Sequence, residues 1–282
     1  MRNRSSVGSL ASLACILELA AFKPGNVSFF FEYQKQKLEH FLSGAIAISE
    51  PMNLLARRKN YSVGKGIYDG VVLMNELQKS GDTHFGTILL FAPIAKSCYY
   101  NKNIKESLSF VLDSLTFIDA LYVFKAFHIA KPKGICDVKT LDIRKKETLE
   151  KIVADRIGLK EFMEAGKNVN TIAYEYSTNY SITFKLLKKF SEEYEKFGLR
   201  EAIKKIYIYQ LSRRADSHII GNHGEKIAIK VKDLANEALK KKNVNELKSF
   251  LEKNRINPGV TADLVATVLF LSLLSGLKVN RV

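Results

Sequence analysis

The sequence has few cysteines and lacks the common nucleotide-binding and hydrolase motifs. Its 3 cysteines, Cys15, Cys98 and Cys136, lie far apart, and none belongs to a Cys-x-x-Cys pair. An odd number of cysteines without metal-ligand spacing predicts reduced thiols in a cytoplasmic protein. Walker A loops, Rossmann glycine fingerprints, Gly-x-Ser-x-Gly elbows and His-Glu-x-x-His helices are all missing, which disfavours the protein classes that depend on them.

Acidic residues are in the minority. Lys and Arg number 44 against 29 Asp and Glu, which gives a formal net charge of +15. Such an excess attracts nucleic acid, phosphorylated metabolites or an anionic membrane surface. The basic residues are mostly scattered, and clusters such as Lys185–Lys189 have the helical spacing of a solvated face. Zinc-finger, aromatic RNA-binding and basic-zipper patterns are absent, so charge alone supports nucleic-acid binding and we do not expect it.

The sequence also lacks a clear membrane segment. Met1–Phe22 resembles a signal peptide, but Glu18 interrupts its apolar run and Lys-Pro-Gly follows instead of a cleavage site. Leu264–Leu277 is shorter than the roughly 20 residues that cross a bilayer. We interpret both segments as buried helices and expect no membrane partner.

Apolar residues recur with helical spacing almost throughout the chain, which predicts an all-α fold. The pattern predicts one long helix of about eight turns that begins near Val169. Val27–Phe31 is a weak strand candidate that reads better as a short irregular connection. Without a linker or a repeat, we expect one compact domain over residues 1–282, with a buried C-terminal helix; a homo-oligomer is left open. Other helices are predicted at Leu38–Ser49, Gly66–Gln78, Gly86–Ser97, Phe117–Ala130, Lys146–Ile157, Leu199–Arg213, Glu225–Lys242 and Val244–Lys253.

Proline is scarce, and 2 of the 5 prolines stand in Pro-Gly pairs beside an apolar helix. The first is Lys23-Pro24-Gly25-Asn26, and the second begins the segment Asn257-Pro258-Gly259-Val260-Thr261-Ala262-Asp263. Turns of this kind can leave backbone N–H groups at a helix end for an anion. Lys suits a phosphate, and Gly allows close backbone approach. A plain helix stop explains the first turn equally well, and an acid that complements the helix dipole explains the second.

Two further polar clusters could carry chemistry. Gly81-Asp82-Thr83-His84-Phe85-Gly86-Thr87 precedes the apolar helix Ile88–Ala95. Helix capping explains Asp82 or Thr83, but it does not require Thr83, His84 and two glycines together. Asp216-Ser217-His218, with Gly224 six residues after the histidine, offers a metal ligand or an acid–base group. A surface turn explains the second cluster nearly as well.

Taken in order, these clusters resemble the triphosphoribosyl-dephospho-CoA synthase family over nearly the whole chain. The most specific match is Asn257-Pro258-Gly259-Val260-Thr261-Ala262-Asp263-Leu264. The other matches are Lys23-Pro24-Gly25, Thr83-His84-Phe85-Gly86 and Asp216-Ser217 with Gly224. Asp119 also stands where the family tends to carry an acid.

The resemblance implies an all-helical transferase that joins ATP to 3′-dephospho-CoA and releases adenine. A ribose 2′-hydroxyl would attack C1′ of the ATP ribose, and the triphosphate would be kept. Mg²⁺, cationic groups or backbone N–H groups would hold that triphosphate. A base would take the hydroxyl proton.

The resemblance also implies roles for particular residues. Asp216 and Asp263 would hold Mg²⁺, with Asp119 as an outer candidate for the catalytic set. His84 or His218 would be the acid–base group. The remaining residues would contact the nucleotide or its phosphates: Lys23, Gly25, Asn26, Thr83, Gly86, Gly224, Asn257, Gly259 and Thr261.

Some positions depart from the family pattern. Asp82 stands where the family prefers Asn, and Asn170 stands where an Asp is expected. Two alternatives therefore stay open. One is a related nucleotide-dependent transferase in coenzyme biosynthesis with another acceptor. The other is a non-catalytic protein that binds a nucleotide or nucleic acid.

Overall fold

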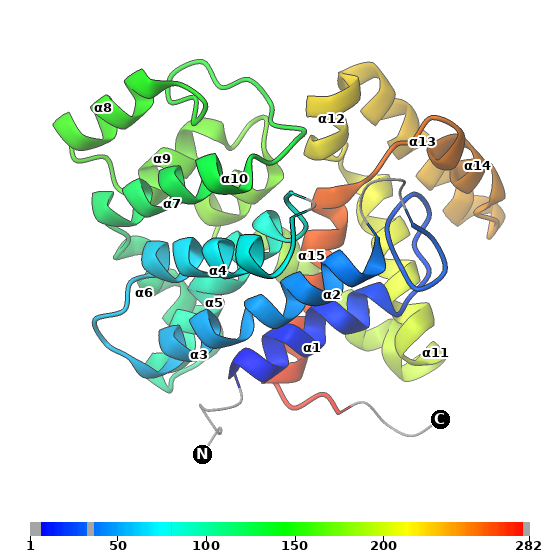
Figure 1. Ribbon diagram of the computed structural model, residues 1–282. Coiled ribbons are helices and arrows are strands. Elements are labelled where there is room, and N and C mark those ends of the chain that lie inside the picture. The colour runs from blue at the N-terminus through cyan, green and yellow to red at the C-terminus, as the bar shows by residue number, and fades with distance from the viewer. Residues whose placement is uncertain (1–6, 33–36, 80, 279–282) are drawn as a thin grey trace.

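The structure is a computed structural model that describes residues 7–32, 37–79 and 81–278. Throughout these ranges the regular elements are helical, and the one extended pairing is an isolated bridge between Ser28 and Phe31. The all-α prediction is confirmed, as is the irregular character of Val27–Phe31. The α-helices of Figure 1 are α1 Val7–Leu19, α2 Leu38–Ala47, α3 Ser49–Arg57, α4 Val63–Leu77, α5 Phe85–Ser97, α6 Ile104–Asp113, α7 Phe117–Ala130, α8 Lys146–Ala154, α9 Leu159–Gly166, α10 Thr171–Ser177, α11 Ser181–Arg213, α12 Ser217–His223, α13 Glu225–Lys241, α14 Asn245–Lys253 and α15 Gly259–Leu274.

Helix α15 forms the centre of the fold. In Figure 1 it runs through the middle of the molecule, and it packs against α1, α5 and α11. Nearly all of its side chains are buried, and the ring of Phe270 stacks on Phe91 of α5 at 4.5 Å. Each fully buried apolar side chain contributes about 1.5–3 kcal/mol, so this helix is a main source of stability. The predicted buried C-terminal helix is confirmed, although it begins at Gly259 and includes the polar segment before Leu264.

The prediction of one long helix from Val169 is wrong. The chain breaks between α10 and α11, where Asn179 and Tyr180 have φ values of 51° and 61°. Buried hydrogen bonds stabilise this break, because the Glu175 carboxylate accepts from the N–H groups of Ile182 and Thr183 at 2.9 and 2.8 Å. These hydrogen bonds form only when the chain folds. The apolar periodicity of the sequence runs on through residues 179 and 180, so it gives no sign of the break.

A second break in the predicted helical pattern lies inside α11, at Gly198, which has φ 74° and ψ −179°. The predicted helix Leu199–Arg213 therefore starts at the right place. Four other helices, α3, α6, α9 and α12, are not indicated by the sequence pattern, and each has 10 residues or fewer. Short helices carry little periodic signal because they present few apolar positions.

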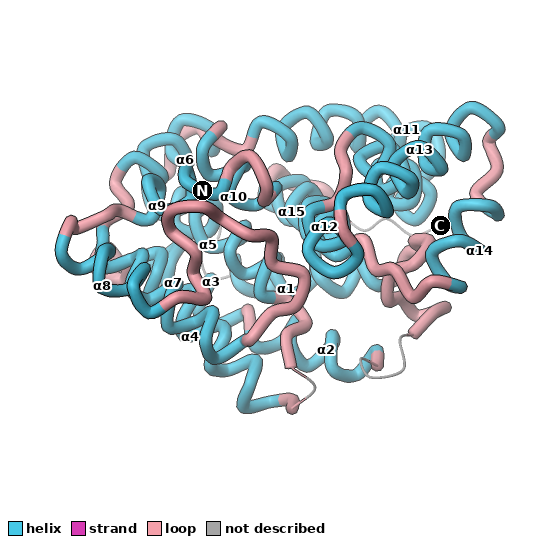
Figure 2. The backbone as a smooth tube through the Cα atoms, turned by 90° about the horizontal axis from the view of Figure 1, so that it is seen from above, coloured by secondary structure: helices cyan, strands magenta, loops and turns pink. Residues whose placement is uncertain are grey.

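The first Pro-Gly turn, which follows α1, lies beside the start of α15 (Figure 1). Figure 2, seen from above, shows that long loops cross this side of the molecule. In the described part of the chain, no single helix has both the length and the apolar composition to cross a membrane. The bent pair α6 and α7 passes that test only when both helices are taken together.

Candidate functional site

A cavity of about 760 Å³ lies where the starts of α5, α12 and α15 approach the first Pro-Gly turn. All four polar clusters of the sequence contribute to its wall. A cavity of this size is typical of sites for small molecules and cofactors. The predicted site residues that line it are Asn26, Thr83, His84, Gly86, His218, Asn257, Gly259 and Asp263.

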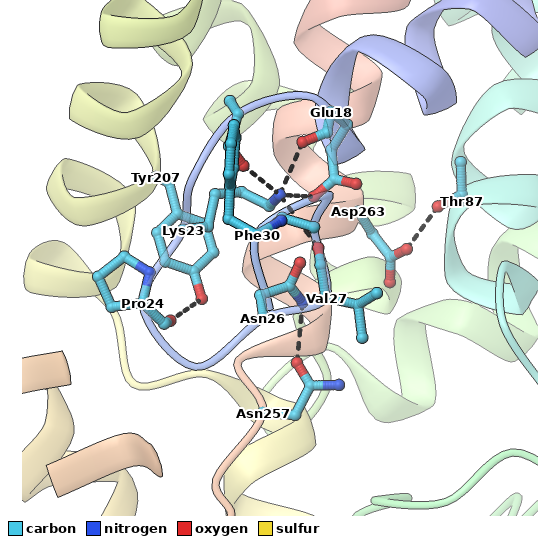
Figure 3. Close-up of polar contacts among 12 residues, drawn as sticks. Glu18, Lys23, Pro24, Asn26, Val27, Phe30, Thr87, Tyr207, Asn257 and Asp263 are labelled. Atoms are coloured by element: carbon cyan, nitrogen blue, oxygen red, sulfur yellow. Dashed lines mark hydrogen bonds and ion pairs between the residues drawn. The ribbon is translucent and has the colours of Figure 1, made fainter. Parts of the chain in front are cut away.

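The two Pro-Gly turns touch each other. The side-chain amides of Asn26 and Asn257 hydrogen-bond at 2.8 Å across 231 positions of sequence (Figure 3). Gly25 has φ 71°, and a Cβ there would lie 2.8 Å from the carbonyl oxygen of Ile256. Glycine at this position therefore allows the turns to approach, and Gly25 itself does not line the cavity.

Lys23 lies inside the protein, with 0% of its surface exposed. Its Nζ contacts the Glu18 carboxylate at 3.0 Å and donates to the carbonyl oxygens of Glu18 and Ala21 at 2.6 and 3.1 Å (Figure 3). Burial lowers the pKa of Lys23 and raises that of Glu18, and their mutual attraction opposes both shifts. Tyr207 holds the same turn by donating to the Pro24 carbonyl oxygen at 2.9 Å. A direct phosphate contact by Lys23, which stays a prediction, would require the ammonium to leave these partners.

Asp216 joins the starts of two helices. Its Oδ1 accepts from the N–H groups of His218 and Ile219 at the start of α12. Its Oδ2 accepts from both the N–H and the hydroxyl of Thr261 in α15, each at 2.7 Å. Asp216 and Thr261 are buried and do not line the cavity. Protein donors thus occupy both oxygens that would otherwise bind Mg²⁺.

Asp119 and Gly224 also lie away from the cavity. Asp119 forms a capping box with Thr116 at the start of α7, and its Oδ1 accepts from the N–H of Gly64 at 2.8 Å. Gly224 connects α12 to α13 with φ 83°, a backbone conformation that favours glycine. The structure therefore shows architectural contacts for both residues.

Asp263 lies in the cavity wall, in the second turn of α15. Its Oδ1 accepts from the Thr87 hydroxyl at 2.5 Å (Figure 3). A Cβ at Gly86 would lie 2.1 Å from Oδ2, so only glycine leaves room for this carboxylate. Burial raises the pKa of Asp263 well above its usual value, and the negative charge of Asp82 raises it further.

His84 stands at the N-cap of α5 and lines the same cavity. Its Nε2 lies 2.8 Å from the carbonyl oxygen of Phe41, which can only accept a hydrogen bond. Nε2 therefore carries the proton, and Nδ1 is the remaining acceptor. Burial lowers the pKa of His84 to about 4, so the ring is neutral near pH 7.

His218 is the second histidine of the wall. Its ring lies between Gly134 and Gly259, where Cβ atoms would approach it to 2.7 and 3.4 Å. Burial lowers the pKa of His218; the charge of Asp216 opposes this shift, and His223 adds to it. A neutral imidazole in a cavity wall can accept a proton from a bound hydroxyl.

The sequence matches the family described as CitG, ATP:dephospho-CoA triphosphoribosyl transferase, over residues 4–282. The chain belongs to this family. The family predicted from the motifs is confirmed, and with it the prediction of a triphosphoribosyl-dephospho-CoA synthase-like transferase.

A solved structure agrees with this membership. The crystal structure of an Archaeoglobus fulgidus protein assigned as a triphosphoribosyl-dephospho-CoA synthase aligns with a TM-score of 0.70 and 26% sequence identity. The alignment covers 84% of this chain and 100% of that chain. No curated protein sequence matches the chain.

The wall of this CitG-family cavity includes cations that sequence reasoning missed. Lys131 and Lys133 come from the loop after α7. Arg255 is a third cation in the cavity wall. Residues 131–134 read Lys-Pro-Lys-Gly and so repeat the Lys-Pro pair of the first turn. This repeat is the local sequence feature that could have marked Lys131 and Lys133 as candidates.

We tested whether these residues suit the Mg²⁺ that the family chemistry implies. Among residues 7–32, 37–79 and 81–278, no group of three or more His, Cys, Asp or Glu could hold a metal ion. A cage made of protein ligands alone therefore does not fit. Asp82 and Asp263 do face the same cavity, and a nucleotide-bound Mg²⁺ typically needs only one or two carboxylates besides phosphate oxygens.

Proposed function

We propose that this CitG-family protein transfers the triphosphoribosyl part of ATP to 3′-dephospho-CoA and releases adenine in the cavity of about 760 Å³. One observation carries the proposal. Four polar segments that are far apart in sequence each contribute predicted site residues to the wall of this one cavity, and Asp263 and His218 are among them. Family membership supports the reaction, and the geometry supports the place.

The triphosphate requires cations. Lys131, Lys133 and Arg255 supply positive charge to the cavity wall, and guanidinium and ammonium groups both bind phosphate. The wall also carries Glu32 and Glu252, besides the aspartates described above. This acidity favours a triphosphate that arrives with Mg²⁺, for which Asp82 and Asp263 are the candidate ligands. The bound Mg²⁺ would neutralise phosphate charge.

The transfer forms a bond between C1′ of the ATP ribose and the 2′-oxygen of dephospho-CoA. The C1′–N9 bond breaks, and adenine leaves with its electron pair and gains a proton. The hydroxyl proton goes to a base, for which we propose His218. The imidazole of His218 lines the cavity. His84 lines it too, with Nδ1 as its acceptor, but burial lowers the pKa of His84 to about 4 and makes it a weak base.

An adenine-release assay tests this function. The full chain is incubated with ATP, Mg²⁺ and dephospho-CoA, and free adenine is measured by chromatography. Adenine release that requires dephospho-CoA is the expected result. Release that requires another acceptor supports the related transferase. Salt-sensitive binding of nucleic acid without turnover overturns the enzymatic proposal.

A further inference from the structure

A second, smaller cavity of about 130 Å³ adjoins the large one. The two share the wall residues Asp82, Phe85, Gly86, Lys133, His218 and Asp263. Away from this junction, the small cavity is mainly apolar. Its walls come from α5, α7, α9, α10 and the loop after α7, with Leu89, Phe127, Ile135, Val138, Phe162 and Met163 among them.

The size of the small cavity limits its occupant. One water molecule needs about 10–15 Å³ of cavity volume. A cavity of about 130 Å³ therefore has room for roughly ten non-hydrogen atoms. A purine base has this size. A nucleoside triphosphate or a whole pantetheine arm is larger, and each would have to remain mostly in the large cavity.

The side chains of the wall also suit a purine nucleobase. The rings of Phe85 and Phe127 lie on it with their centroids 6.2 Å apart, and Phe162 adds a third ring. Stacking a base on an aromatic side chain is worth about 1–3 kcal/mol. Asn170 supplies a polar group at the same wall, and its Oδ1 already caps α10 by accepting from the N–H of Ala173 at 3.0 Å. The side-chain NH₂ of Asn170 can still donate to an acceptor nitrogen on the edge of a purine.

We propose that the small cavity binds the purine base of the donor nucleotide, while the large cavity holds its triphosphate and the acceptor. The inference rests on the proposed function for the identity of the donor. It places the bond between base and ribose at the junction of the two cavities. Asp263 and His218 lie at that junction.

Filling the small cavity tests the proposal. Val138→Phe adds a ring at a half-buried position of the wall. Val169→Phe makes the same change at a side chain that is 37% exposed and lines neither cavity. Binding of free adenine and of inorganic tripolyphosphate is measured separately by calorimetry on the full-length variants. We expect Val138→Phe to raise the Kd for adenine at least tenfold and to leave that for tripolyphosphate unchanged. Val169→Phe should change neither.

Adenine binding does not require turnover, so this test separates the two proposals. A chain that binds adenine and loses it in Val138→Phe supports the base site even if no transfer is detected. Equal adenine binding by both variants, or none by the parent chain, overturns the base site even if transfer proceeds. A higher KM for dephospho-CoA alone would assign the cavity to the acceptor and also overturn it. If thermal melting shows that Val138→Phe is unfolded, Val138→Leu replaces it in the same comparison.

Discussion

Asp216 and Thr261, 45 positions apart, meet through two hydrogen bonds of 2.7 Å to a single carboxylate oxygen. The other oxygen of Asp216 caps α12, so one buried side chain sets the relative positions of two helix starts. Gly259 at the start of α15 and His218 in α12 both line the cavity, and they lie next to each other. Asp216 thus builds the site without facing its contents.

We predict that Asp216→Ala lowers the free energy of unfolding by about 1–4 kcal/mol, since it removes two helix caps and each lost cap costs about 0.5–2 kcal/mol. Urea denaturation followed by circular dichroism measures the change. Asp216→Asn keeps one oxygen acceptor and should cost less. An Asp216→Ala protein of parental stability would contradict the double-cap interpretation.

For Asp263 we predict a loss of activity without a loss of stability, whereas the prediction for Asp216→Ala is a loss of stability. Asp263→Asn keeps the side-chain volume and an acceptor for Thr87 but removes a carboxylate from the cavity wall. Adenine release should fall about 100-fold or more, as is typical when a catalytic electrostatic contact is lost. Stability should be retained or increased, because burial disfavours the charged form of this group. Unchanged turnover would show that the Asp263 carboxylate takes no part in the reaction.

A third prediction concerns the loop after α7. Lys133→Ala should raise the KM for ATP about tenfold, since a hydrogen bond to a charged group is worth about 1.5–3 kcal/mol and solvent weakens it at this exposed position. Lys139→Ala is the matched control, because Lys139 is an exposed residue of the same loop that lines neither cavity. Steady-state kinetics at two ionic strengths measures both variants. Equal KM values for the two would show that charge on this loop acts only at long range.

A fourth prediction separates the two possible roles of Lys23. Lys23→Met leaves the buried Glu18 without its partner and should lower stability by about 3–5 kcal/mol. The double variant Glu18→Leu/Lys23→Met should regain much of this loss. Urea unfolding of the single and double variants measures it. A stable Lys23→Met protein that no longer binds tripolyphosphate would instead support a direct phosphate contact.

A fifth prediction concerns pH. The pKa of His84 is lowered from 6.5 to about 4 in the folded state, so the unfolded chain binds the proton more tightly. The resulting stability is fully present above pH 6.5 and is lost as the pH falls toward 4. The stability difference between the parent protein and His84→Asn should therefore shrink by about 3 kcal/mol between pH 7 and pH 4. Asp82, whose pKa burial raises to about 6, titrates in both proteins, so its contribution cancels. A constant difference across this range would exclude the burial shift.

Part of the candidate site was readable in the sequence. The Pro-Gly pairs and the clusters around His84 and His218 are local patterns, and the structure brings a member of each to one cavity. Lys131, Lys133 and Arg255 could not be singled out in the same way. Any of the 44 basic residues is chemically able to bind phosphate, and only position decides which of them face the cavity.

By itself, the sequence determined the helical class, the buried C-terminal helix and the family, because periodicity and ordered local motifs are properties of neighbouring residues. Tertiary structure decided which polar residues support the site and which line it. Lys23, Asp119 and Asp216 resemble ligands in sequence, yet each is buried among hydrogen-bond partners. Burying a charge is costly unless donors or acceptors satisfy it. The partners of Asp119 and Asp216 include Gly64 and Thr261, which are 55 and 45 positions away, so the local motifs could not show that these carboxylates are already satisfied. The partners of Lys23 lie within five positions, but only the fold of the turn directs the ammonium toward them.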